Sequence, residues 1–157
     1  MLDGVGPDVG IVVNDNGGRQ SSSPMAMHLV DPKFLQRWCN DCRVDTSNVW
    51  HAIGSIACFM EDQDSRYLDC AINLLEGNKL QQLIRIAKVL KYGADRYEPN
   101  NWRLIPQEDH INHALIHIIA HLMGDTQDDH IDHALCRLMM ALATSPSEGF
   151  SYTSYVK

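Results

Sequence analysis

The sequence has 157 residues, a formal net charge of −7 at pH 7 and 45% hydrophobic residues. A chain of this size is expected to fold as one domain with a buried core, and its acidic balance argues against a nucleic-acid-binding protein, because such proteins need an excess of basic side chains. No stretch approaches the ~18 consecutive apolar residues of a membrane-spanning helix. The first residues also lack the basic and apolar stretches of a secretory signal, so we expect a cytoplasmic protein whose five cysteines stay reduced.

The N-terminal residues 1–30 are rich in Gly and Ser, and only Val9 to Val13 could form a short strand. We expect a flexible arm, or alternatively an arm that embraces another subunit. Asp31 and Pro32 then predict a short helix over residues 32–42. It ends in Cys39-x-x-Cys42, which is a weak signal for structural zinc because such a site needs four ligands and no second CxxC occurs.

Apolar residues at helical spacing predict four further helices. They cover residues 46–60, 65–75, 78–92 and 129–143. Gly93 is expected to end the third of them, and residues 94–106 are expected to form a loop. The sequence thus predicts an all-α domain over residues 31–143 and a peripheral C-terminal tail over residues 144–157.

Two parts of the chain resemble one another. HAIGSIACFMEDQDSRYLDCAINLL, from His51, aligns with HALIHIIAHLMGDTQDDHIDHALCRLM, from His113, and places Asp62 over Asp125 and Asp69 over Asp132. This alignment indicates a duplicated helical hairpin, with chance similarity between two amphipathic hairpins as the alternative.

Six of the eight histidines lie between His110 and His133, interleaved with four aspartates. At about 100° per residue, His110, His113, His117 and His121 share one side of a helix, and a turn at Gly124 leads into a second helix. Imidazoles and carboxylates together suit a divalent metal ion, although both polar sides could instead face water. The candidate metal ligands are Asp125, Asp128, Asp129, Asp132, His117, His130 and His133. Convergence at the turn makes Asp125, Asp128 and His133 the candidate catalytic residues.

Residues 79–103 contain nearly half of the Lys and Arg residues of this acidic chain. Lys88, Lys91 and Arg103 are candidates for holding phosphate groups. Tyr97 and Trp102 offer flat apolar surfaces on which a base could stack. The alternative is a solvated helix face followed by a loop that a buried Trp holds in place.

Three segments carry a resemblance to a known family: LKYGADRYEPNNWRLIP, INHALIHIIAHLMGD and DHIDHALCRLMMAL. Over residues 76–143 the chain resembles the phage family of MazG-related dATP/dGTP diphosphohydrolases. The matching residues are Tyr92-Gly93-Ala94, Tyr97, Asn101-Trp102, His117, Gly124, Asp128, His130 and His133-Ala134. The chain departs from the family pattern at Arg96, Ile116 and Asp125, where the family has Lys, Arg and Glu.

The resemblance implies a MazG-like helical bundle that hydrolyses a purine deoxynucleoside triphosphate to the monophosphate and pyrophosphate in a host cytoplasm. Mg²⁺ or Mn²⁺ in the Asp/His cluster would activate a water that attacks the α-phosphorus. Asn101 joins the substrate-binding candidates through the matched motif. A homo-oligomer is expected, because the polar helix sides need a covering layer, from a second subunit or from the first hairpin.

Two other classes of protein remain open from the sequence. One is an HD-type triphosphohydrolase, although no adjacent His-Asp pair occurs in the chain. The other is a non-catalytic helical interaction module, in which the histidines would form a pH-sensitive contact surface.

Overall fold

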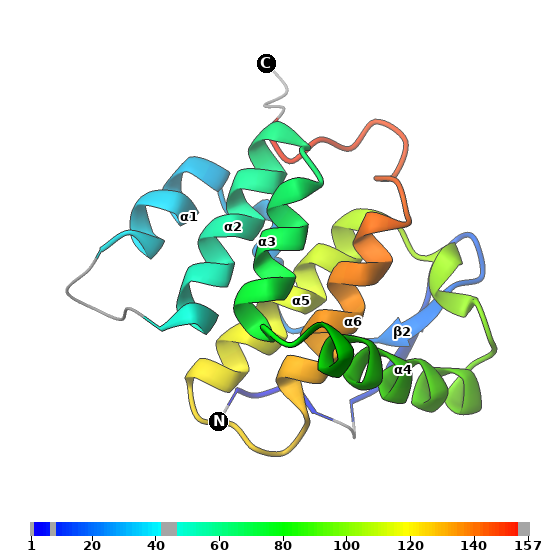
Figure 1. Cartoon of the computed structure of the whole chain (residues 1–157). Coiled ribbons are helices and arrows are strands. Elements are labelled where there is room, and N and C mark those ends of the chain that lie inside the picture. The colour runs from blue at the N-terminus through cyan, green and yellow to red at the C-terminus, as the bar shows by residue number, and fades with distance from the viewer. Residues whose placement is uncertain (1, 7–8, 42–46, 154–157) are drawn as a thin grey trace.

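The structure is a computed structural model, and it describes residues 2–6, 9–41 and 47–153 (Figure 1). Two helical hairpins pack face to face. The first consists of α2 (Asn48–Asp62) and α3 (Arg66–Leu75), and the second of α5 (Gln107–Leu122) and α6 (His130–Leu142). Their apolar sides form the main core, which includes Ile53, Ile56, Leu68, Leu115 and Leu135. The prediction of an all-α bundle is therefore confirmed, and the idea of a duplicated hairpin stays a prediction.

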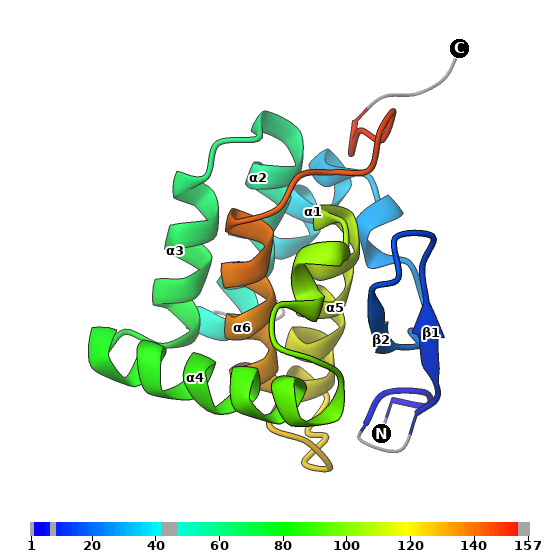
Figure 2. The same ribbon diagram turned by 90° about the vertical axis from the view of Figure 1, so that its right-hand side faces the viewer.

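Two further helices flank this bundle (Figure 2). Helix α1 (Pro32–Cys39) packs on α2, and the side chain of Asp31 accepts a hydrogen bond from the Phe34 backbone N–H at its start. Helix α4 (Lys79–Arg96) lies crosswise to the bundle and contacts α6. The zinc alternative falls partly outside the described residues, because Cys42 is not among them. The thiol of Cys39 is buried and donates to the backbone oxygen of Trp50.

The end of α4 differs from the sequence prediction. Gly93 does not end the helix, which continues to Arg96. The backbone N–H of Tyr97 still donates to the oxygen of Gly93 at 2.8 Å. The helix ends shortly before Pro99, because the residue before a proline avoids the helical conformation. The expected loop also contains a short 3-10 helix, η2 (Asn101–Leu104).

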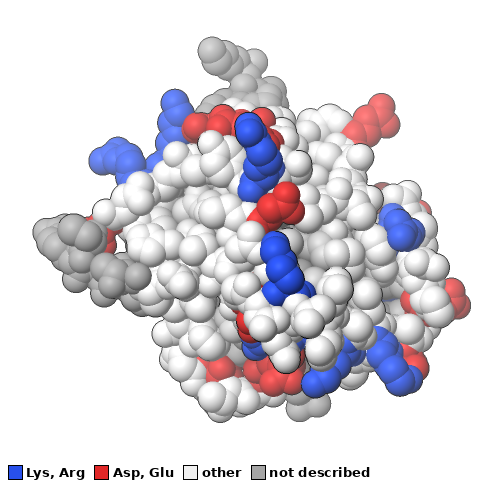
Figure 3. Space-filling model, in the orientation of Figure 1, with Lys and Arg blue, Asp and Glu red and all other residues white. Residues whose placement is uncertain are grey.

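Helix α4 presents apolar side chains to solvent. Leu80, Leu83 and Ile84 are 72%, 67% and 46% exposed, and they lie on one side of the helix with Ala87. Among the described residues of α4, only Gln82 is buried. The face of the molecule in Figure 3, which includes α4, accordingly shows uncharged surface between scattered Lys, Arg, Asp and Glu side chains.

The turn between α5 and α6 follows the sequence prediction closely. Gly124 has φ +84°, the left-handed conformation that favours glycine. Helix α6 begins without a side-chain capping hydrogen bond. Asp129 occupies the capping position without such a bond, and Asp128 Oδ1 instead accepts from the Asp129 N–H at 2.9 Å.

The N-terminal segment contains a β-hairpin that rests on the helical domain. Strand β1 (Ile11–Val13) pairs antiparallel with β2 (Arg19–Ser21), and the hairpin lies beside α5 in Figure 2. Amide side chains dock it. Asn101 donates to the Arg19 oxygen and accepts from its N–H, and Asn112 accepts from the Met27 N–H. The segment that the sequence presents as an arm is thus tied to η2 and α5.

The hairpin and α4 explain how the polar side of α5 is covered. The side chains of His110 and His113 are buried, and the β-hairpin and α4 cover this side of α5. Helices α2 and α3 pack against the opposite, apolar side of the α5–α6 hairpin. A covering layer therefore comes from the β-hairpin and α4 of the same chain, and the expectation that the first helical hairpin supplies it is wrong. The expected second subunit stays a prediction. The tail also reaches inward: Tyr152 is buried in the core, and its hydroxyl donates to Gln107 Oε1.

Candidate active site

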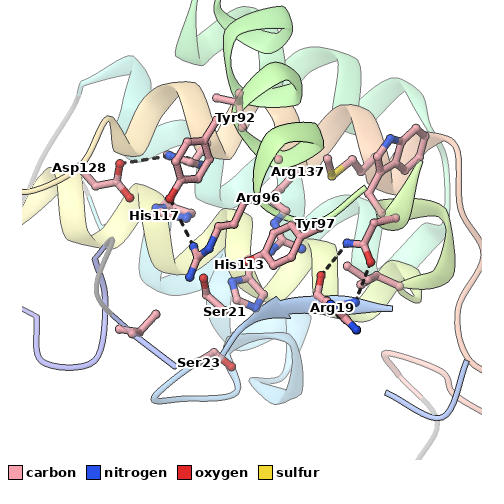
Figure 4. A pocket seen from close by; sticks show the side chains of 18 of the residues that line it. Arg19, Ser21, Ser23, Tyr92, Arg96, Tyr97, His113, His117, Asp128 and Arg137 are labelled. Carbon is pink, nitrogen blue, oxygen red and sulfur yellow. Dashed lines mark hydrogen bonds and ion pairs between the residues drawn. The ribbon is translucent and has the colours of Figure 1, made fainter. Parts of the chain in front are cut away.

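A cavity of about 500 Å³ lies between the β-hairpin, α4, η2, α5 and α6 (Figure 4). This volume is within the range of small-molecule sites. Its polar and aromatic lining includes Arg19, Tyr92, Arg96, Tyr97, Asn101, Trp102, His113, His117, Asp128, Asp129, His133 and Arg137. Segments that are far apart in the sequence therefore meet around one space.

One wall of the cavity carries carboxylates and imidazoles. His133 Nε2 lies 3.1 Å from Asp128 Oδ1, and the ring of His117 stacks on that of His133, with centroids 5.0 Å apart. Burial raises the pKa of Asp128, but the hydrogen bond and charge of His133, together with the Asp129 N–H, outweigh it and bring the pKa down to about 2. Asp128 is therefore fully ionised at neutral pH.

His117 is oriented by the imidazole of His130, which is buried behind this wall beside Asp125. Its Nδ1 lies 2.9 Å from His130 Nδ1, and His130 Nε2 lies 3.6 Å from Asp125 Oδ2. Burial, reinforced by the charges of His133 and Arg137, holds the pKa of His117 well below its ordinary value, so the ring is neutral at pH 7. When His117 Nδ1–H donates to His130, the lone pair of His117 Nε2 is left free to accept a proton or bind a metal.

The expected cluster of seven metal ligands is divided in the structure. Asp128, Asp129, His117 and His133 line the cavity, and Asp125 and His130 are buried behind it. Asp132 forms an ion pair with Arg85, which also pairs with Glu76. Within the described ranges, no three His, Cys, Asp or Glu side chains converge closely enough to hold a metal ion by themselves.

The opposite side of the cavity is basic and aromatic. The guanidinium of Arg96 lies 5.3 Å from the ring centroid of Tyr97 and 6.0 Å from that of Tyr92. Figure 4 shows Arg96 and Tyr97 facing His113 and His117 across the space. Arg19 comes from the hairpin. Arg137 also faces the cavity, but it belongs to the wall of carboxylates and imidazoles, because it lies one turn after His133 on α6. These cations face the cavity, whereas two of the three expected phosphate-binding residues, Lys88 and Lys91, are exposed on α4 and do not line it.

The remaining candidates lie at the hairpin side of the cavity. Tyr97, Asn101 and Trp102 all line it, but the side chain of Asn101 is occupied by the backbone of Arg19. The expected phosphate-binding residue Arg103 is exposed and covers one face of the Trp102 ring at 4.2 Å. Trp102 also meets the ring of His110 edge to face, with centroids 6.4 Å apart, so only the part of its ring that lines the cavity is open to a ligand.

Sequence reasoning missed Arg19, Arg96 and Arg137 as substrate-binding candidates. Arg137 follows His133 by four residues, so helical spacing placed both on one side of α6 and could have identified it. No local signal identified Arg19, because its place at the cavity depends on hairpin contacts across 82 residues of sequence.

Comparison with known proteins identifies the family of the chain. A family model described as dATP/dGTP diphosphohydrolase, N-terminal, matches residues 61–149, which is more than half of the chain. The match spans α4, η2, α5 and α6, and so covers every part of the cavity lining except the N-terminal segment with its hairpin. Neither the curated proteins nor the solved structures gave a match, and no helix in the described ranges is long and apolar enough to span a membrane. The chain therefore belongs to the MazG-related dATP/dGTP diphosphohydrolase family, whose members are hydrolases acting on nucleotide anhydride bonds.

Proposed function

We propose that this chain hydrolyses dGTP or dATP to the monophosphate and pyrophosphate, with the triphosphate bound between the two walls of the cavity. The observation that carries the proposal is the division of charge. Guanidinium groups of Arg19 and Arg96 line one wall, the Asp128 carboxylate and the imidazoles of His117 and His133 line the other, and Arg137 lies one turn after His133 on that second wall. Guanidinium groups suit phosphate oxygens, and the second wall suits the activation of water.

The cavity fits a divalent metal that arrives with its substrate. Mg²⁺ is commonly held by one or two carboxylates while substrate phosphates supply further oxygens, and Asp128 and Asp129 offer two carboxylates on one wall. His133 would add a nitrogen donor that suits Mn²⁺ better than Mg²⁺. When bound, such a metal would neutralise phosphate charge and lower the pKa of a coordinated water.

The side chains of the protein would do the remaining work. Asp128 stays ionised and orients His133 through their 3.1 Å contact. His117 is neutral, and its Nε2 can accept a proton from a water that attacks the α-phosphorus. Tyr97 and the part of the Trp102 ring that lines the cavity would supply stacking surfaces for the purine.

Product analysis tests this function. Purified protein is incubated with dGTP or dATP and either Mg²⁺ or Mn²⁺, and the products are separated by ion exchange. We expect the monophosphate and pyrophosphate, and loss of turnover in His117→Ala. Release of nucleoside and triphosphate, or no turnover of either nucleotide, would contradict the proposal.

A further inference from the structure

Arg137 is a cation in the wall of the cavity that has no acidic partner. Its Nη1 donates to Gln20 Oε1 and to His110 Nδ1, each at 3.1 Å. None of the ion pairs among the described residues involves Arg137. A largely buried charge without a counter-ion is costly, so this arrangement indicates that an anion completes it.

Both groups that hold Arg137 are uncharged. Burial, with a smaller contribution from the charge of Arg137, lowers the pKa of His110 to about 3. His110 Nε2 lies 3.0 Å from the Trp102 oxygen, so Nε2–H donates there and Nδ1 is left as the acceptor for Arg137. The guanidinium is therefore aligned without being neutralised, and its Nε and Nη2 donors have no partner among the residues described.

Gln20 lies between Arg137 and the carboxylate of Asp109. Its Nε2 donates to Asp109 Oδ2 at 2.9 Å, while its Oε1 accepts from Arg137. The amide of Gln20 joins Asp109 to Arg137 through hydrogen bonds, but it carries no net charge and so does not neutralise the guanidinium. Without Gln20, the carboxylate of Asp109 would be the natural ion-pair partner of Arg137 and would compete with an incoming anion.

Gln20 belongs to strand β2 of the hairpin, outside the segment that the family model matches. Gln20 is nevertheless buried, at 7% exposed. The side chain of Asn101 holds the adjacent residue Arg19 by accepting from its backbone N–H and donating to its backbone oxygen. The hairpin is therefore joined to the catalytic domain at the point where Gln20 meets Arg137.

We infer that Arg137 is a phosphate-binding residue for the nucleotide, and that Gln20 of the hairpin is a positioning residue that keeps it aligned and free of Asp109. This inference rests on the proposed function for the identity of the ligand. It assigns the hairpin a direct part in binding the substrate.

Binding of inorganic pyrophosphate to the full chain tests this without any turnover. Isothermal titration in metal-free buffer should show a loss of affinity of about 10- to 100-fold in Arg137→Gln, because hydrogen bonds to a charged group contribute about 1.5–3 kcal/mol. Arg137→Lys, which keeps the charge but loses the fork of donors, should lie between that variant and the wild type. Arg37→Gln makes the same change at an exposed position on α1 and should bind as the wild type does.

A second set of variants tests the role of Gln20 in pyrophosphate binding. Gln20→Glu places a carboxylate beside Arg137 and should weaken pyrophosphate binding more than Gln20→Met, which only removes the amide. In the double variant Gln20→Glu/Arg137→Gln the effect of the Gln20 substitution should disappear, because its target is gone. A merely structural role would lower the melting temperature of Gln20→Met and Gln20→Glu alike and would leave their effect on binding independent of Arg137.

Two outcomes separate this inference from the proposed reaction. Pyrophosphate affinity that depends on Arg137 and Gln20 would support the anion site even if neither dGTP nor dATP is hydrolysed. Unchanged pyrophosphate affinity and unchanged KM in folded Arg137→Gln would overturn the inference even if the wild type hydrolyses both. Should Arg137→Gln fail to fold, equal affinities for Gln20→Glu, Gln20→Met and the wild type would also overturn it.

Discussion

Three histidines of α5 lie at increasing distance from solvent, and this depth determines what each can do. His117 is partly exposed to the cavity, His113 is 7% exposed, and His110 is fully buried. Burial is the largest cause of the lowered pKa of all three. His110 therefore serves as a neutral support for Arg137, whereas His117 is placed to meet a ligand.

These buried histidines should make the stability of the protein fall in mild acid. Below the ordinary histidine pKa of 6.5 the unfolded chain takes up protons that the folded chain excludes, down to about pH 3 in the case of His110. Each such histidine lowers the free energy of unfolding by about 1.4 kcal/mol per pH unit in this window. Denaturant unfolding at pH 7.5, 6.5 and 5.5 measures the slope.

The slope should be smaller in His110→Gln, because one of the excluded protons is lost. His121→Gln changes an exposed histidine of the same helix and should leave the slope unchanged. A free energy of unfolding that stays constant between pH 6.5 and 5 would show that these histidines are not excluded from protonation.

Metal binding should depend on the residues that line the cavity. A metal that binds the folded chain raises the melting temperature by mass action, and Mn²⁺ should do so in the wild type. The increment should vanish in Asp128→Asn and His133→Ala but persist in Asp132→Asn, because Asp132 pairs with Arg85 away from the cavity. Thermal unfolding with and without Mn²⁺ measures this, and loss of the increment in Asp132→Asn instead would place the metal on the outer side of α6.

At the scale of the elements, the sequence was informative wherever a helix buries one side. The helices of both hairpins, α1 and the turn at Gly124 were all predicted, because apolar periodicity and capping residues act locally. The end of α4 and the docking of the hairpin were not predicted. The docking depends on contacts such as Asn101 to Arg19 and Gln20 to Arg137, which join residues 82 and 117 positions apart, whereas α4 continues past its glycine and ends shortly before Pro99.

The same distinction applies to the candidate site. The spacing of His117, Asp128 and His133 placed them on one wall before the fold was known. The spacing did not indicate that Asp125 and His130 are buried behind that wall. The burial of a side chain depends on which other elements cover α5 and α6. Lys88 and Lys91 were chosen for their charge, and the rotation of α4 turns both toward solvent.

Gly93 provides a sharp test of how α4 ends. Its backbone is helical rather than left-handed, and no atom lies within 4 Å of an added Cβ. Gly93→Ala should therefore raise the free energy of unfolding by about 0.5–1 kcal/mol, because glycine weakens a helix interior by this amount. Chemical denaturation measures the difference.

Gly124→Ala is the matched control, because Gly124 also has open space around it but has φ +84°. It should destabilise the protein. A decrease in stability of Gly93→Ala similar to that of Gly124→Ala would mean that Gly93 is a left-handed helix end, as the sequence pattern had indicated.

At the scale of the whole molecule, the apolar side of α4 is exposed to solvent in the single chain. The layer over the polar side of α5 comes from the same chain, so a homo-oligomer is not needed to bury the active site. Leu80, Leu83 and Ile84 nevertheless form an apolar stripe along an 18-residue helix. Exposed stripes of this kind mark contact surfaces, and a two-fold axis would pack the stripe against its own copy.

We therefore propose a homodimer that forms through α4. Light scattering coupled to size exclusion should give twice the monomer mass of 17.7 kDa for the wild type. Leu83→Glu should give the monomer mass with unchanged helical content, because a charge at the centre of the stripe costs more in the interface than in water. Phe34→Glu makes the same kind of change at a 57% exposed residue of α1, and that variant should stay dimeric. A wild type that elutes as a monomer at tens of micromolar would contradict the proposal, and a dimer broken by Phe34→Glu but not by Leu83→Glu would move the interface from α4 to α1.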